Sequence, residues 1–251
     1  MERGRPPLVR TLDDVAALTG STVTLDDPDE PGWEPADAVA ADPARFAAQL
    51  DPASRNAPGR RAGALWMVEA RAWWAAELVA GTLLEARRVP RLAPDAVAVR
   101  IGPEGQAAAV APRSGGFHCL PDDPDRDHDD ARVAVDEAAL AAAARDELVA
   151  VCEPIVAAVD AAGLRRRRVA WRSVGDRVVQ ALGYVGDLSG RREQGWRWAT
   201  AIVDAPGPLR IPFAFELREG ASFAYRATCC LNYRDPAEER CVSCPVRAPR
   251  G

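Results

Sequence analysis

Four of the six cysteines lie in the last 23 residues, and this cluster constrains the fold more than any other feature of the chain. They form an adjacent pair, Cys229-Cys230, then after ten residues a Cys241-x2-Cys244 pair. A C-x2-C pair brings two sulfurs onto one metal, and four thiolates fit zinc or an iron–sulfur cluster. Adjacent side chains on a strand point to opposite faces, so the first pair needs a bend to serve one site. The tail is predicted to hold a metal centre, with a zinc staple or free thiols as alternatives.

The composition places the chain among globular proteins. It has 251 residues, of which 48% are hydrophobic and 27% charged, enough to bury a core without a metal or disulfide. No apolar run reaches the roughly 20 residues of a membrane span, and residues 1–7 lead into no apolar stretch typical of a secretory signal. We therefore expect a cytoplasmic protein, whose thiols stay reduced. The net charge of −5 argues against a nucleic-acid partner.

Apolar periodicity predicts a mostly helical chain. Long helices are expected over 62–88, 135–161 and 169–184, and Pro154 predicts a break in the second near Cys152–Glu153. Residues 97–101 and 107–111, separated by a turn at 102–105, predict an antiparallel hairpin. The remaining expectations are short helices near 12–18 and 43–50, a loop over 54–61, strands near 213–217 and 222–226, a helix or strand over 196–203, and interruptions at Gly183, Gly186 and Gly190.

The cysteine-bearing segment resembles a known family. Residues 225–234, with the sequence YRATCCLNYR, and 241–245, with CVSCP, are similar to the C-terminal signature of FhuF-like ferric siderophore reductases. In that family a C-C-x10-C-x2-C motif holds a [2Fe–2S] cluster, and all four cysteine positions match. Residues 152–155 and 168–174 are more weakly similar to helical segments of the same family. The resemblance implies that the cluster ligands are Cys229, Cys230, Cys241 and Cys244.

The resemblance also implies a function, namely cytoplasmic reduction of Fe(III) bound to an imported siderophore. Hard oxygen ligands hold Fe(III) far more tightly than Fe(II), so one added electron releases the metal, and a [2Fe–2S] cluster is a one-electron carrier. The sequence contains no G-x-G-x-x-G fingerprint and no P-loop, so a separate electron donor is expected. Two alternatives stay open: a binding module whose tail is stapled by zinc, and an electron carrier without siderophore reductase activity.

The expected fold class is α+β, predominantly helical, with a short antiparallel β-hairpin and a small C-terminal cysteine-rich iron–sulfur element. Three parts are predicted. Residues 1–60 form a poorly patterned N-terminal segment, 61–205 a helical reductase-like domain that binds the siderophore, and 206–251 the [2Fe–2S]-binding element. From residue 218 onward six arginines stand against four acidic residues, among them Arg226, Arg234 and Arg240. This basic surface is expected either to attract an anionic chelate or acidic donor, or only to aid solubility.

Four other features are weaker candidates. Residues 125–129 resemble the start of a calcium loop, but the sixth position is Asp130 and the twelfth Asp136, where such loops need glycine and glutamate, so an acidic surface loop is favoured. His118 and Cys119 are expected in a loop rather than at a metal. Cys152 is interpreted as a buried small hydrophobe. The run 165–168 contains four arginines and indicates either an anionic-siderophore contact or a solvated helix start.

Overall fold

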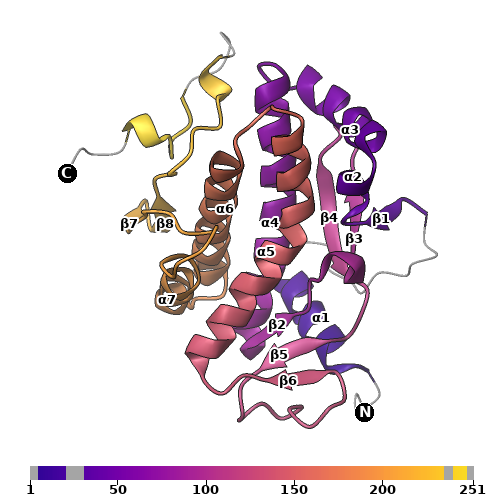
Figure 1. Cartoon of the computed structure of the whole chain (residues 1–251). Coiled ribbons are helices and arrows are strands. Elements are labelled where there is room, and N and C mark those ends of the chain that lie inside the picture. The colour runs from indigo at the N-terminus through magenta and orange to yellow at the C-terminus, as the bar shows by residue number, and fades with distance from the viewer. Residues whose placement is uncertain (1–4, 21–30, 235–239, 248–251) are drawn as a thin grey trace.

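The computed structural model describes residues 5–20, 31–234 and 240–247. In these residues helices predominate and three small sheets flank them, which confirms the α+β, mostly helical class (Figure 1). The helices are α1 (Pro7–Thr19), α2 (Ala38–Ala41), α3 (Pro43–Arg55), α4 (Arg60–Ala86), α5 (Glu137–Ala161), α6 (Arg167–Leu188) and α7 (Arg192–Val203), with 3₁₀ turns η1 (Pro94–Ala96), η2 (Asn232–Arg234) and η3 (Pro245–Arg247). The strands are β1 (Trp33–Pro35), β2 (Arg88–Pro90), β3 (Val97–Ile101), β4 (Ala107–Pro112), β5 (Phe117–Cys119), β6 (Ala131–Val133), β7 (Phe215–Arg218) and β8 (Ala221–Ala224).

The sheets are short and mainly antiparallel. The strand orders are β1-β3-β4, β2-β5-β6 and β7-β8, and only the β5–β6 pair is parallel among the described strands. The predicted hairpin is confirmed as β3–β4, with Val99 opposite Val110. The second pair of expected strands forms the β7–β8 hairpin, which turns at Glu219-Gly220. β1 and α2 lie in the N-terminal region, where the sequence pattern predicts neither.

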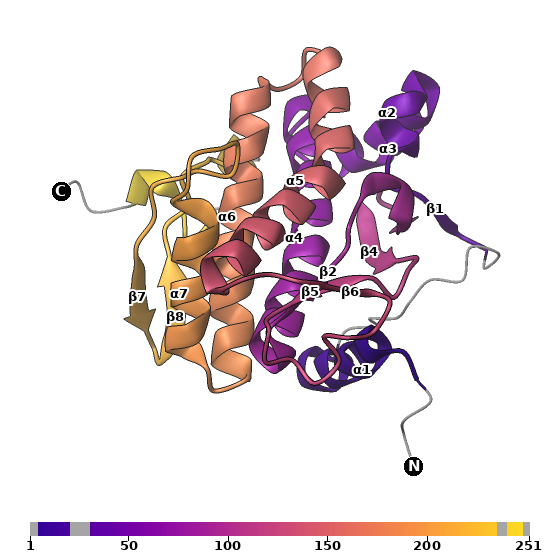
Figure 2. The ribbon, with the colours of Figure 1, turned by 60° about the horizontal axis from the view of Figure 1, so that its bottom comes forward.

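Helix α4 lies at the centre of the molecule, with α5 and α6 beside it (Figures 1 and 2). Apolar residues on several of its faces, including Leu65, Val68, Val79 and Leu83, are almost fully buried, as the wide apolar pattern of 62–88 predicts. The helix ends at Arg87, which adopts a left-handed conformation and donates its backbone N–H to the Leu83 carbonyl. No helix of the described residues is long and apolar enough to cross a membrane.

The break predicted in α5 is wrong, because the helix runs without interruption from Glu137 to Ala161. Pro154 removes one backbone hydrogen bond, but it lies on a buried face together with Val151, Ile155 and Val159. Packing of this face against the core offsets the lost hydrogen bond, since most helix stability in proteins comes from such packing.

The interruptions predicted at Gly183 and Gly186 are also wrong, because α6 continues through both to Leu188. These glycines permit close packing instead. A Cβ at Gly183 would lie 2.9 Å from the Phe215 ring, and one at Gly195 of α7 would lie 2.4 Å from the Leu182 carbonyl. Residues 196–203, for which the sequence predicts either a helix or a strand, are part of helix α7.

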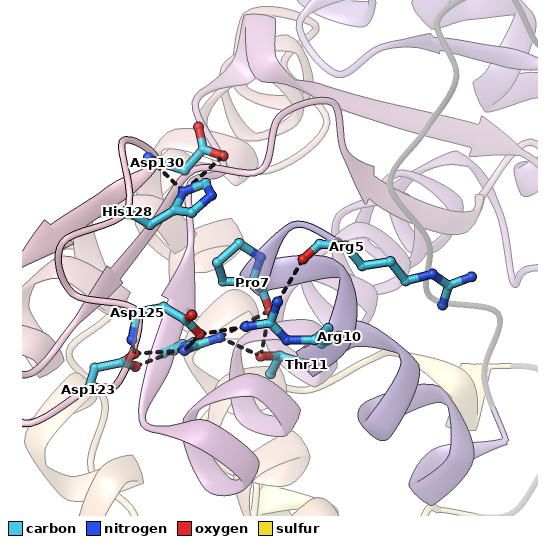
Figure 3. A network of polar contacts seen from close by, with 9 residues as sticks. Arg5, Pro7, Arg10, Thr11, Asp123, Asp125, His128 and Asp130 are labelled. Atoms are coloured by element: carbon cyan, nitrogen blue, oxygen red, sulfur yellow. Dashed lines mark hydrogen bonds and ion pairs between the residues drawn. The ribbon is translucent and has the colours of Figure 1, made fainter. Parts of the chain in front are cut away.

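A buried arginine, Arg88, connects the acidic loop 121–130 to the N-terminal helix. Figure 3 shows Asp123 and Asp125 of this loop beside Arg10 and Thr11 of α1. Arg88 donates two hydrogen bonds to Asp123, of 2.8 and 2.7 Å, and one of 2.6 Å to Asp125. It also contacts Thr11 of α1, and Arg10 of the same helix pairs with Asp125 at 2.7 Å. Asp123 is buried, so this part of the acidic loop is not solvated. The guanidinium groups of the two arginines satisfy both carboxylates.

Candidate metal centre

The cysteine segment follows β8, and two of its sulfurs lie at metal-sharing distance. The Sγ atoms of Cys230 and Cys241 are 3.9 Å apart. Metal–sulfur bonds of about 2.3 Å in tetrahedral geometry place two thiolates about 3.8 Å apart, so these sulfurs fit one metal. Cys229 Sγ accepts a 3.4 Å hydrogen bond from Leu231 N, and the buried Cys244 donates its N–H to the Cys241 carbonyl. The chain turns directly after the adjacent cysteines, at Leu231, whose φ is +66°.

The structure therefore brings two of the four predicted ligands to ligand spacing. In the described part of the chain no three His, Cys, Asp or Glu side chains are arranged to hold a metal ion. The donor set nevertheless has the chemistry that an iron–sulfur centre requires, since four thiols lie on one short segment. Burial, followed by the neighbouring Cys230 sulfur, raises the pKa of the Cys241 thiol to about 11. Metal binding would release that proton.

A carboxylate of α6 anchors the start of the segment. Asp176 accepts the backbone N–H groups of Ala227 at 2.6 Å and Thr228 at 2.9 Å, immediately before Cys229. Burial raises the pKa of Asp176 to about 6, although the bond from Ala227 and the charge of Arg226 oppose this shift. The adjacent cysteines are thus held against α6 by two backbone hydrogen bonds.

A buried ion-pair network holds the segment against α4 as well. The Arg226 guanidinium pairs with Glu69 of α4 and lies 3.8 Å from Asp176, and its backbone N–H bonds to the Ser243 carbonyl. Glu69 also accepts hydrogen bonds of 2.5 Å from Ser173 and Arg177. Burial alone would raise the pKa of Glu69, but the two guanidinium groups overcome this and lower it. Arg226 thus joins both halves of the cysteine motif to the helices, and its expected role on a basic surface is wrong because it is buried.

A pocket of about 560 Å³ opens beside the cysteines. Cys230 and Cys241 form part of its wall. Trp66 of α4 also lines it and donates its indole N–H to the Cys230 carbonyl at 3.2 Å, which links the helix to the cysteine segment. The Trp74 indole N–H is fixed by a 3.0 Å bond to the Ala107 carbonyl. The full lining comprises Trp66, Glu69, Ala70, Trp73, Trp74, Gln106, Ala107, Arg177, Gln180, Arg226, Cys230, Asn232, Cys241 and Ser243.

Sequence reasoning missed this pocket. The apolar pattern of 62–88 predicts a largely buried helix, whereas Trp66, Trp73 and Trp74 are partly exposed. No motif in the sequence marks Glu69 or Arg177 as residues of a site. The available signal was the spacing of aromatic residues at i, i+7 and i+8, with an acidic residue between them, on a helix made mainly of alanine and leucine.

The other candidate residues do not line this pocket. Cys119 and Cys152 are fully buried in the core, and burial raises the pKa of their thiols to about 11 and 12. His118 lies in strand β5, not in a loop, and its Nε2 is 2.9 Å from a Glu147 carboxylate oxygen. The four arginines of 165–168 lead into α6, where Arg167 pairs with the exposed Glu153, whereas Arg165 lies close enough to Cys229 and Glu69 to interact with them electrostatically.

Among the comparisons with known proteins, the match to a family model agrees with the motif. A solved structure of aerobactin synthetase IucA, from a hypervirulent pathotype of Klebsiella pneumoniae, aligns with a TM-score of 0.40 and 13% identity over 77% of this chain. The chain covers 34% of that synthetase, about a third of its length. No curated protein matches the sequence. The family model of the FhuF 2Fe-2S C-terminal domain matches residues 226–245, a range that contains all four C-terminal cysteines. This match confirms, over residues 226–245, the resemblance to the FhuF-like family that the cysteine motif predicts.

Proposed function

We propose that the protein is a cytoplasmic ferric siderophore reductase that carries a [2Fe–2S] cluster on Cys229, Cys230, Cys241 and Cys244. The match of residues 226–245 to a 2Fe-2S domain carries this proposal. Two structural features support it. The 3.9 Å separation of the Cys230 and Cys241 sulfurs suits a shared iron, and a pocket of small-molecule size adjoins both residues.

Bound to the cysteines, the cluster supplies one electron at a time. The chain's own residues do the rest. Asp176 and Arg226 hold the cysteine segment against α4 and α6, so the distance from the cysteines to the pocket is fixed. The pocket brings a ferric chelate beside Cys230 and Cys241. One electron from a separate donor protein converts the chelate's Fe(III) to Fe(II), which the hard oxygen ligands then release.

The test is the composition and reactivity of anaerobically purified protein. We expect about two irons and two sulfides per chain, with thiolate-to-iron absorption in the visible. Stopped-flow mixing of the chemically reduced protein with ferric siderophores should reoxidise it, with one Fe(II) trapped per electron. NADPH alone should not reduce it, because the sequence carries no dinucleotide fingerprint.

Each alternative function has its own outcome in this experiment. A folded, colourless protein with stoichiometric zinc would establish the zinc-stapled module instead. A [2Fe–2S] protein that every ferric siderophore fails to reoxidise would be a plain electron carrier. Serine at any of the four C-terminal cysteines should lose or destabilise the cluster. Cys119→Ala and Cys152→Ala are the matched controls, because both thiols are buried in the core and should leave the iron content unchanged.

A further inference from the structure

We propose that the pocket beside Cys230 and Cys241 binds the organic shell of the ferric chelate through tryptophan rings rather than through charge. This inference rests on the proposed function and deepens it, because it names the site and the forces that select the ligand. Three observations carry it: the position of the pocket, the exposed aromatic surface of its wall, and the mutual pairing of its charged groups.

The position of the pocket places its contents against the cysteine segment. Cys230 and Cys241, whose sulfurs lie 3.9 Å apart, both line it. Trp66 lines it as well and bonds directly to the Cys230 backbone. A chelate in this space therefore contacts the residues that are proposed to hold the cluster, and no gating movement is needed to bring donor and acceptor together. Its volume of about 560 Å³ lies within the roughly 300–1,000 Å³ of small-molecule sites.

The wall of the pocket is aromatic in a place where burial would be the default. Trp66, Trp73 and Trp74 remain partly exposed although the rest of α4 is largely buried in the core. Clustered apolar side chains that stay accessible on a soluble protein commonly mark a binding site. The rings are held in place, since Trp66 and Trp74 each donate a hydrogen bond to a carbonyl and Trp73 packs near Tyr184. A rigid aromatic wall binds without the entropic cost of ordering side chains.

The charged groups of the pocket are already paired with one another. Glu69 forms ion pairs with both Arg177 and Arg226, and the buried Arg226 also lies 3.8 Å from Asp176, so two arginines face two carboxyl groups. The remaining polar lining includes the neutral amides Gln106 and Gln180. Paired charges present little net field to a ligand, so affinity should depend on ring contacts and only weakly on ionic strength.

The experiment measures binding without electron transfer. Gallium(III) has the charge of ferric iron but accepts no electron under these conditions, so the gallium complexes of desferrioxamine B and enterobactin are titrated into oxidised, cluster-loaded protein by calorimetry. At least one complex should bind. Trp73→Ala should weaken its binding about tenfold, and Ala70→Leu, which fills the pocket without removing a contact, should weaken it at least as much. Ala201→Leu, on the exposed surface of α7, is the matched control and should not alter binding.

The outcomes separate this inference from the proposed function. Unchanged affinity in both Trp73→Ala and Ala70→Leu, with normal iron content and circular dichroism, would overturn the pocket assignment. A failure of both gallium complexes to bind the wild type would overturn it as well. More than a tenfold loss of affinity between 50 and 500 mM salt would overturn the claim that charge is secondary. Binding that the variants abolish, combined with no reoxidation by ferric chelates, would leave the site standing and refute the reductase. Reoxidation undiminished in the variants would do the reverse.

Discussion

At the scale of single residues, the contact with the largest consequence is the buried pair of Glu69 and Arg226. Removing one partner of a buried ion pair costs about 3–5 kcal/mol, because the other charge stays desolvated. Glu69→Gln should therefore lower the free energy of unfolding by several kcal/mol, measured in urea. The matched control is Glu85→Gln on the same helix, whose pair with Arg191 is partly exposed and should be worth about 1 kcal/mol or less. Equal losses in the two variants would contradict the assigned role of Glu69.

Glu69 also makes the free energy of unfolding depend on pH. Burial acts to raise the pKa of Glu69, but Arg226 and Arg177 lower it below its ordinary value of 4.5. A carboxyl group with a lowered folded pKa stabilises the protein fully above its unfolded pKa, and this contribution is lost as pH falls through the folded value. The wild type should lose this part of its stability only below about pH 4.5, and the stability difference between wild type and Glu69→Gln should shrink there. A difference that stays constant from pH 7 to pH 3 would show that folding does not shift the pKa of Glu69, and a wild type that gains stability relative to the variant as pH falls would show that folding raises it.

At the scale of elements, the glycines of α6 and α7 act through packing. Helix propensity alone predicts that Gly195→Ala stabilises α7 by about 1 kcal/mol. The structure predicts the opposite sign, since the new Cβ would lie 2.4 Å from the Leu182 carbonyl and push the helices apart, at a cost of about 1–3 kcal/mol. Thermal or urea unfolding decides between the two. Gly102→Ala is the control, because its Cβ would make only ordinary contacts, the nearest at 3.5 Å.

This contrast also explains how much of the fold and site could be predicted from the sequence. Periodicity located α4, α5, α6 and both hairpins, because one apolar face is enough to mark an element. It placed breaks at Pro154 and Gly183, where local preference yields to contacts with distant residues such as Phe215. The spacing of the cysteines was enough to predict a metal site. The pocket could not be predicted, because whether Trp73 faces the core or a cavity depends on which surfaces the other elements leave uncovered.

At the scale of the whole molecule, we predict that the helices fold without the residues that follow Pro212. Leu209 and Ile211 are buried and cover Gly175 of α6, whereas the buried apolar residues described beyond this point are only Ala224, Leu231 and Cys244. The described residues after it contribute a hairpin and the cysteine segment but no α-helix. Ending the chain after Pro212 should therefore preserve helical circular dichroism and cooperative unfolding while abolishing iron binding. Stability should fall by several kcal/mol, because Glu69 then keeps only Arg177 as an ion-pair partner.

A second truncation separates the two consequences of that deletion. Ending the chain after Arg234 removes Cys241 and Cys244 but keeps Arg226 and its contacts with Glu69 and Asp176. This variant should also bind no [2Fe–2S] cluster, since two thiolates cannot hold one, yet it should retain most of the stability lost in the shorter chain. Urea unfolding of both variants, with iron analysis, makes the comparison. Collapse of the helical signal in the shorter chain would show that the C-terminal segment is part of the folding core. Equal stability of the two variants would instead remove Arg226 from its place as the connection between the cysteine segment and the helices.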